Sequence, residues 1–77
     1  MNKEEIKKEI GGNIRKAREL AGVSQIELAK GIGHQSAAYI SFAEKGERNI
    51  TATDLTLVAK FLRIPSYYLL PHKSTNT

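Results

Sequence analysis

Hydrophobic residues recur along the chain at intervals of three and four, and no stretch alternates hydrophobic and polar residues for long enough to predict a strand. In the first segment the residues with this spacing are Ile6, Ile10, Ile14, Ala17 and Ala21. They predict one face of a helix that ends at Gly22. Each glycine of the Gly11-Gly12 pair costs about 1 kcal/mol inside a helix. We therefore treat residues 1–9 as an N-terminal helical extension, either separate or fraying.

Two further helices are predicted from their end signals. Ser24 and Glu27 have the spacing of a capping box, which starts a second helix over about residues 24–31. The closely spaced Gly31 and Gly33 predict a sharp turn after it. A third helix is expected over about residues 36–44, with Gly46 as the next stop.

The C-terminal part begins with a second capping-box spacing, from Thr51 to Asp54. A fourth helix follows, and its core stripe comprises Leu55, Val58, Ala59 and Leu62. Pro65 breaks this helix, a short fifth helix is expected over residues 67–70, and Pro71 stops it. Residues 72–77 are polar and are predicted to be a disordered tail. The pattern thus predicts an all-α, compact five-helix domain over residues 10–71.

The composition narrows the class of protein. The chain has 77 residues, no cysteine and a formal net charge of +4. It suits one small domain without disulfides or a thiolate zinc cluster, and it contains no hydrophobic run of the roughly 20 residues that a membrane span needs. A basic domain is a weak indication of a nucleic-acid partner. These features favour a cytoplasmic protein with no membrane association.

Two short capped helices joined by a glycine turn are typical of a helix-turn-helix. The residues that match a known pattern are Ile10-Gly11, Ile14-Arg15, Ala17-Arg18, Gly22-Val23-Ser24-Gln25, Leu28-Ala29, Ile32-Gly33, Ile40-Ser41, Glu44-Lys45-Gly46, Arg48-Asn49, Leu55, Val58-Ala59, Leu62 and Tyr68-Leu69-Leu70. From Ile10 to Leu70 the chain resembles the lambda-repressor/Cro-type helix-turn-helix family, often called the XRE family. The resemblance implies a lambda-repressor-like fold and a regulator that binds double-stranded DNA.

The resemblance also implies roles for single residues. Gln25 stands where the family has a glutamine that touches a phosphate and braces the recognition helix. Arg18 and Glu44 match a structural ion pair between the first helix and the end of the third.

The recognition helix departs from the family pattern. One more residue than usual lies between Gly33 and Ile40, which leaves the register at its start open by one position. Counting back from Ile40 and Glu44, the residues expected to face the DNA groove are Gln35, Ser36, Ala37, Ala38, Ser41 and Phe42. A glutamine can bind adenine, and alanine or phenylalanine can pack on thymine methyl groups. In the alternative interpretation, Ala37, Ala38 and Phe42 contact protein, and Ile40 belongs to the core in either case.

Phosphate contacts are expected from residues that follow the third helix, namely Lys45, Arg48 and Asn49. A solvated charged surface explains Lys45 and Arg48 almost equally well.

The C-terminal segment carries more hydrophobic surface than one small core can hide, and in the resembling family this end often forms a twofold dimer interface. The residues expected there are Phe61, Ile64, Tyr67, Tyr68 and Leu70. A homodimer would present two recognition helices about 34 Å apart to a palindromic operator. Tyr67 and Tyr68 can equally close the core of a single chain.

Two hypotheses about function follow. The first is a sequence-specific transcriptional regulator, a repressor encoded by a bacterium or phage. The second is a protein-interaction module with the same fold, such as an antirepressor or an antitoxin-like partner, which the alanine-rich recognition helix favours. An enzyme is not expected, because His34 and His72 lack partners at motif spacing. We likewise expect no cofactor, metal ion or small-molecule substrate.

Overall fold

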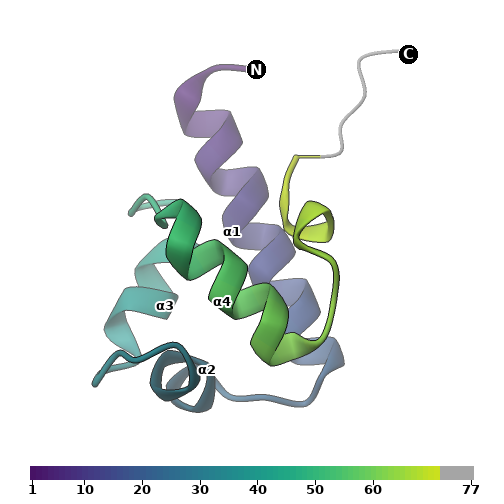
Figure 1. The fold of residues 1–77 in the computed structure, drawn as a ribbon. Coiled ribbons are helices and arrows are strands. Elements are labelled where there is room, and N and C mark those ends of the chain that lie inside the picture. The colour runs from purple at the N-terminus through teal and green to yellow at the C-terminus, as the bar shows by residue number, and fades with distance from the viewer. Residues whose placement is uncertain (72–77) are drawn as a thin grey trace.

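The computed structural model describes residues 1–71, which are all-helical and contain no β-strand. The elements are α1 (Lys3–Leu20), α2 (Gln25–Gly31), α3 (Ala38–Glu44), α4 (Ala52–Leu62) and a short 3-10 helix, η1 (Ser66–Leu69). Figure 1 shows α1 and α4 in the middle of the molecule, with α3 and η1 on opposite sides of them and α2 at the end away from the N-terminus. None of the described helices is long and hydrophobic enough to cross a membrane. The expected tail, residues 72–77, lies outside the described residues.

The expected fifth helix is a single 3-10 turn, so residues 1–71 form four α-helices and not five. Only residues 66–70 separate Pro65 from Pro71, and this is too short for an α-helix of ordinary length. The turn is held against α1 because the Asn13 side-chain amide donates to the carbonyl oxygens of Leu69 and Leu70, at 3.3 and 3.0 Å.

Helix α1 runs without a break through Gly11 and Gly12, so residues 3–9 extend the same helix. Its start is fixed by a capping box, in which Asn2 and Glu5 each accept a backbone N–H of the other at 2.9 Å. Gly11 is buried against the end of α3, where a Cβ would overlap the Ala43 carbonyl oxygen. Nothing lies within 4 Å of a Cβ built on Gly12. The first glycine therefore permits the close approach of α1 and α3.

The other helix starts agree with the sequence in two cases and differ in one. Ser24 accepts the Glu27 N–H in a complete capping box, and Thr51 accepts the Asp54 N–H at 3.0 Å. The third helix begins at Ala38, two residues later than the predicted Ser36. The physical reason is local, because the Ser36 hydroxyl accepts the Ala38 N–H at 3.0 Å and so belongs to the turn before the helix.

The core lies where α1 to α4 and η1 meet. Its fully buried large side chains are Ile14, Leu28, Ile40, Val58 and Leu69, one from each element. Ala29, Ala43 and Ala59 are buried beside them, and their small size lets the short helices pack closely. Ile40 is a core residue, as the sequence predicts.

The helices end in left-handed residues. Gly22, Gly33 and Gly46 follow α1, α2 and α3 with φ of 72°, 89° and 75°. Helix α4 ends instead at Arg63, with φ of 61°, and it is the one non-glycine residue with positive φ among those described. A side chain in this conformation costs about 1–2 kcal/mol.

Replacing Arg63 with Gly is therefore expected to raise the free energy of unfolding by about 0.5–1 kcal/mol, because the strain is removed while glycine loses more entropy on folding. Urea denaturation of the two proteins measures the difference. Arg63→Ala is the matched control, since alanine keeps the Cβ that causes the strain. Equal stability of the Gly and Ala variants would contradict this explanation.

Candidate nucleic-acid interface

Helices α2 and α3 form a helix-turn-helix through a turn that begins at Ile32. The N–H groups of Gly33 and His34 close α2 by bonding to the Lys30 and Ala29 carbonyls, at 3.1 and 2.8 Å. This closure sends the chain sharply away from the axis of α2. Helix α3 buries Ile40 and Ala43 on its inner side, and its opposite side faces solvent.

The residues predicted to face the groove are not all equally accessible. Gln35 and Ser36 are exposed in the turn, and Ala38 is exposed at the first position of α3. Phe42 exposes 44% of its surface one turn further on. Ala37, the residue before the helix, and Ser41 within it are half-buried. The solvent-facing side of α3 is thus small and largely hydrophobic at its surface.

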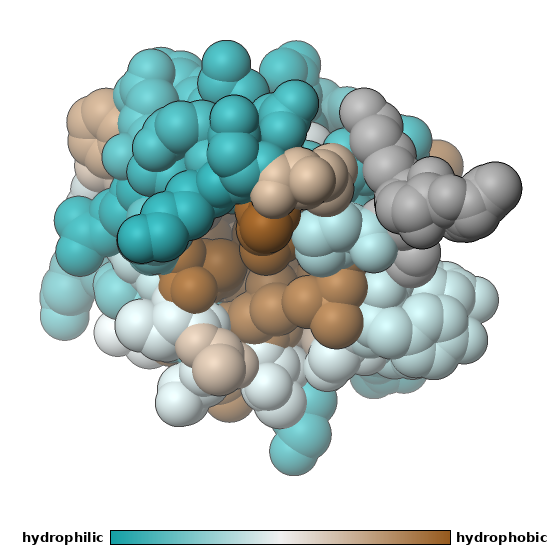
Figure 2. All heavy atoms as spheres, turned by 90° about the horizontal axis from the view of Figure 1, so that it is seen from above, coloured by the Kyte–Doolittle hydropathy of each residue, from teal (hydrophilic) through white to brown (hydrophobic). Residues whose placement is uncertain are grey.

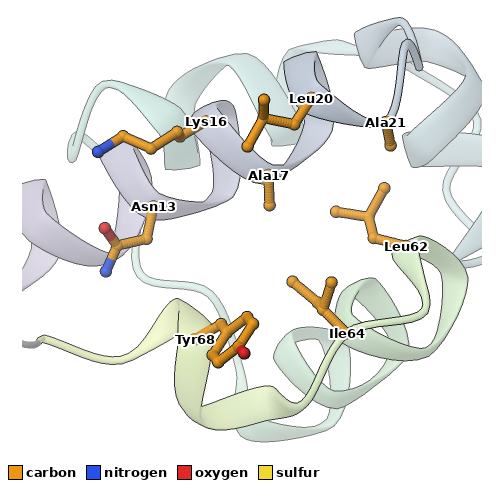
Figure 3. A pocket seen from close by; sticks show the side chains of 8 residues that line it. All are labelled: Asn13, Lys16, Ala17, Leu20, Ala21, Leu62, Ile64 and Tyr68. Atoms are coloured by element: carbon orange, nitrogen blue, oxygen red, sulfur yellow. The ribbon is translucent and has the colours of Figure 1, made fainter.

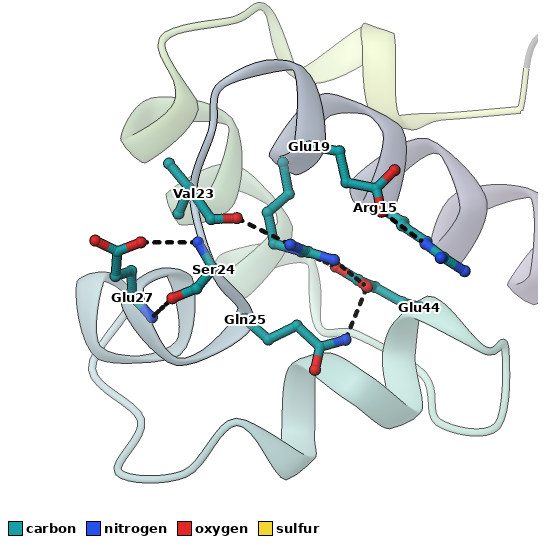
Figure 4. Close-up of polar contacts among 8 residues, drawn as sticks. Arg15, Glu19, Val23, Ser24, Gln25, Glu27 and Glu44 are labelled. Atoms are coloured by element: carbon teal, nitrogen blue, oxygen red, sulfur yellow. Dashed lines mark hydrogen bonds and ion pairs between the residues drawn. The ribbon is translucent and has the colours of Figure 1, made fainter.

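A buried polar network holds α3 in place. Arg18 of α1 donates through Nε and Nη2 to the two carboxylate oxygens of Glu44 at the end of α3, at 2.6 and 3.1 Å. The two side chains are only 11% and 3% exposed. The Arg18 Nη1 also donates to the Val23 carbonyl at 2.9 Å, as Figure 4 shows. The hydrogen bond to Glu44 is the main cause that raises the pKa of Arg18 above its usual value.

Gln25 joins the same network from the start of α2. Its Nε2 donates to Glu44 Oε1 at 3.0 Å (Figure 4). Glu44 therefore accepts hydrogen bonds from α1 and from α2 at once, and it ties the third helix to both. Because the network is almost dry, these bonds are stronger than they would be in water.

A polar hollow of about 290 Å³ opens beside this network. It is lined by Arg15, Arg18, Gln25, Ser41, Glu44 and Lys45. Arg15 was not singled out by the sequence patterns as a site residue. It lies one helical turn before Arg18, and this i, i+3 spacing on one helix face was the available signal. Arg15 Nε forms an exposed ion pair with Glu19 Oε2, at 3.1 Å, on the same helix.

The basic residues after α3 lie over aromatic rings of the helix. Lys45 Nζ is 5.8 Å from the centre of the Phe42 ring, and Arg48 Cζ is 5.0 Å from the centre of the Tyr39 ring. Both distances are within the range of cation–π attraction. Lys45, Arg48 and Asn49 are all exposed, so the positive charge lies beside the solvent-facing side of α3.

Tyr39 has a second neighbour in the turn, which the sequence did not reveal. The His34 ring stacks on Tyr39 with centres 4.1 Å apart and planes at 12°, and His34 Nε2 lies 3.0 Å from the Asp54 carboxylate of α4. Burial raises the pKa of Tyr39, and the interaction of its hydroxyl with Asp54 acts in the same direction. Burial also acts to raise the pKa of Asp54, but its neighbours Tyr39, His34 and Thr51 outweigh this and lower it.

The predicted dimer residues Tyr67 and Tyr68 belong to η1, which lies across α1 and α4 from α3 in Figure 1. Tyr67 and Tyr68 contact each other edge to face and stay 60% and 50% exposed, and Leu70 is exposed as well. The core is closed at this end by Leu69. Ile64 is half-buried, and the Phe61 ring packs beside Gly31 of α2 while remaining partly exposed.

A hydrophobic groove of about 470 Å³ separates the end of α1 from the α4–η1 connection. Figure 3 shows its lining side chains, which are Asn13, Lys16, Ala17, Leu20, Ala21, Leu62, Ile64 and Tyr68. Leu20 is 84% exposed at its rim. On the side where α1 begins, Figure 2 shows further hydrophobic atoms in a hollow surrounded by hydrophilic ones. A single chain thus leaves hydrophobic surface uncovered in more than one place.

Comparison with known proteins identifies the class. The sequence profile of the helix-turn-helix family HTH_3 matches residues 14–69. The chain belongs to this family, also called the XRE family, and is a DNA-binding regulator of the helix-turn-helix class. No curated protein sequence matches it significantly.

Solved structures of regulators have the same fold. The DNA-binding domain of BldD from S. venezulae is 31% identical, with a TM-score of 0.76 over 87% of this chain and 99% of that one. The restriction-modification controller protein C.AhdI from Aeromonas hydrophila is 28% identical, with a TM-score of 0.76 over 82% and 94% of the two chains. The clp gene regulator ClgR from Corynebacterium glutamicum is 25% identical, with a TM-score of 0.78 over 82% and 66%.

Proposed function

We propose that the protein is a sequence-specific transcriptional repressor of bacterial or phage origin, which acts in the cytoplasm and binds a palindromic operator as a homodimer. The observation that carries this proposal is the anchoring of α3. Glu44 fixes the helix to α1 and α2 from inside, while Ala38 and Phe42 stay exposed on its outer side. Such a rigid, outward-facing helix suits the major groove of DNA. The similarity to a restriction-modification controller protein and to a clp gene regulator supports a role in transcription.

The proposed contacts divide into two kinds. Gln35 and the small or hydrophobic residues of α3 read bases, through an amide pair with adenine and packing on thymine methyl groups. Arg15, Gln25, Lys45, Arg48 and Asn49 surround that surface and bind phosphates, which position the protein on the duplex. No nucleophile, metal ion or cofactor takes part in this function, and the protein is not an enzyme.

The proposed dimer uses the C-terminal surface of Phe61, Ile64, Tyr67, Tyr68 and Leu70. Because η1 and α3 lie on opposite sides of α1 and α4 in Figure 1, pairing centred on η1 would leave the recognition helix uncovered. A twofold axis through it would place two copies of α3 on successive turns of DNA, about 34 Å apart. The operator would then be two inverted half-sites.

The test is selection of bound duplexes from a random pool, followed by affinity measurements on the selected sequence and on a shuffled one. We expect two inverted half-sites one helical turn apart and a preference of at least about a thousandfold over the shuffled duplex. Ala38→Glu should lower the affinity for the selected duplex about tenfold or more, because a negatively charged carboxylate would then face the DNA. Thr56→Glu, at an exposed position of α4 outside the proposed DNA and dimer surfaces, is the control and should bind like the wild type.

Two results would refute the proposal. Equal binding to all duplexes would exclude a sequence-specific regulator. Retention of DNA affinity in Ala38→Glu would place the DNA contact elsewhere. A protein-interaction module would show the first result, together with loss of a protein partner in Phe42→Ala.

A further inference from the structure

Four side chains from separate segments form a continuous series of contacts beside α3. Asp54 of α4 holds the His34 ring at 3.0 Å, His34 stacks on Tyr39 of α3, and the Arg48 guanidinium lies over the same tyrosine ring at 5.0 Å. The series crosses from α4 through the turn to α3 and on to the loop behind it. Only its last member is fully exposed.

The contacts restrict the tyrosine ring strongly. His34 lies parallel to it, with the ring centres 4.1 Å apart, so the ring cannot turn without losing this stack. His34 is itself held by the Asp54 carboxylate, which is only 17% exposed. The Tyr39 hydroxyl is buried on the side of Asp54 and the Thr51 backbone. The tyrosine is therefore held with its hydroxyl inside and its ring in contact with His34 and Arg48.

The Tyr39 ring positions Arg48, and this contact leaves the charge of the guanidinium unpaired. A guanidinium that lies over an aromatic ring is attracted to it by charge and still has N–H groups available to an acceptor. Within the described residues Arg48 forms no ion pair and no hydrogen bond. A charged planar group with open donors, held beside the exposed side of α3, has the geometry that a phosphate oxygen pair requires.

We propose that Tyr39 is a positioning residue for DNA binding, which holds the Arg48 guanidinium ready for a backbone phosphate of the duplex. This inference rests on the proposed function and adds to it a residue that touches no DNA. The contact with Tyr39 restricts the rotamers of the Arg48 side chain before DNA binds. The side chain therefore loses less entropy when it binds a phosphate. His34 acts through Tyr39 in the same way.

The experiment is a double-mutant cycle on the selected duplex at several salt concentrations. Arg48→Ala should lower the slope of log affinity against log salt by about 1, because one phosphate contact is lost. Tyr39→Leu should weaken binding about two- to fivefold in the wild-type background, the range of an exposed cation–π contact. In the Arg48→Ala background the same change should have no effect.

Two variants separate positioning from folding. Tyr39→Phe keeps the ring, and its folded form should bind like the wild type, since the buried hydroxyl faces Asp54 and not the DNA. His34→Ala removes a side chain that is one-third exposed and leaves the core intact. The same double-mutant cycle is measured with His34→Ala in place of Tyr39→Leu. Circular dichroism at the binding temperature gives the folded fraction of each protein.

The outcomes are distinct. Equal losses from Tyr39→Leu and from His34→Ala in both Arg48 backgrounds would show a structural role only and would overturn the inference. An unchanged salt slope in Arg48→Ala would overturn it as well. In both cases the wild type still selects its duplex, and the proposed function stands. If the wild type selects no duplex, the proposed function is refuted, and the inference is refuted with it.

Discussion

Glu44→Gln is expected to lower the free energy of unfolding by about 3–5 kcal/mol. The variant keeps the shape of the side chain but leaves the Arg18 charge without a counter-charge at a site where Arg18 is 11% exposed. Glutamine also brings N–H donors to a position where Glu44 accepts from both Arg18 and Gln25. In a domain of this size such a loss lowers the melting temperature by at least about 10 °C, measured by circular dichroism.

The matched control is Glu19→Gln. Glu19 pairs with Arg15 at 3.1 Å, but both side chains are more than half exposed. An exposed pair at i, i+4 contributes about 0.3–0.5 kcal/mol, so this variant should melt close to the wild type. Similar losses in the two variants would contradict the view that burial makes the Arg18–Glu44 pair indispensable. They would also remove the basis for a rigidly anchored α3.

Gly11→Ala is expected to lower the free energy of unfolding by about 2–3 kcal/mol. A Cβ there would overlap the Ala43 carbonyl oxygen and lie 2.7 Å from that of Glu44, and backbone atoms cannot rotate away. The better helix propensity of alanine, about 1 kcal/mol, offsets only part of this cost. Since the overlap is with the end of α3, DNA affinity should fall together with stability.

Gly12→Ala is the control for this prediction, because the same helix and the same substitution meet open space. It should raise the free energy of unfolding by about 0.5–1 kcal/mol. Urea denaturation of both variants measures the change in the free energy of unfolding, which should be a decrease for Gly11→Ala and an increase for Gly12→Ala. If Gly11→Ala were as stabilising as Gly12→Ala, the close approach of α1 and α3 would be wrong.

The comparison of these glycines shows where sequence patterns are sufficient. Hydrophobic spacing and capping residues placed α2 and the start of α4 correctly, because a helix start depends on neighbours three or four residues away. The same local reasoning could assign only a penalty to Gly11 and Gly12. Which glycine the fold requires depends on α3, more than thirty residues along the chain.

The residues of the candidate interface likewise fall into those that the sequence revealed and those that only the structure revealed. Gln25, Lys45 and Arg48 were assigned to the interface from the family pattern. Arg15 also matches that pattern, but its place beside the end of α3 became clear only from the structure. The third helix was expected to start near Ser36 and starts two residues later, because the Ser36 hydroxyl bonds within the turn. Competition between a side chain and the helix for the same N–H is decided by turn geometry that periodicity does not contain.

By itself, the sequence determined the all-helical class, the helix-turn-helix and part of the core, such as Ile14, Ile40 and Val58, since periodicity and capping act over a few residues. Only the tertiary structure decided that Leu69 and not Tyr67 or Tyr68 closes the core, and that His34 and Arg48 meet at Tyr39. These contacts join residues from different elements. They depend on how closely the helices approach, which is set by packing and not by local pattern.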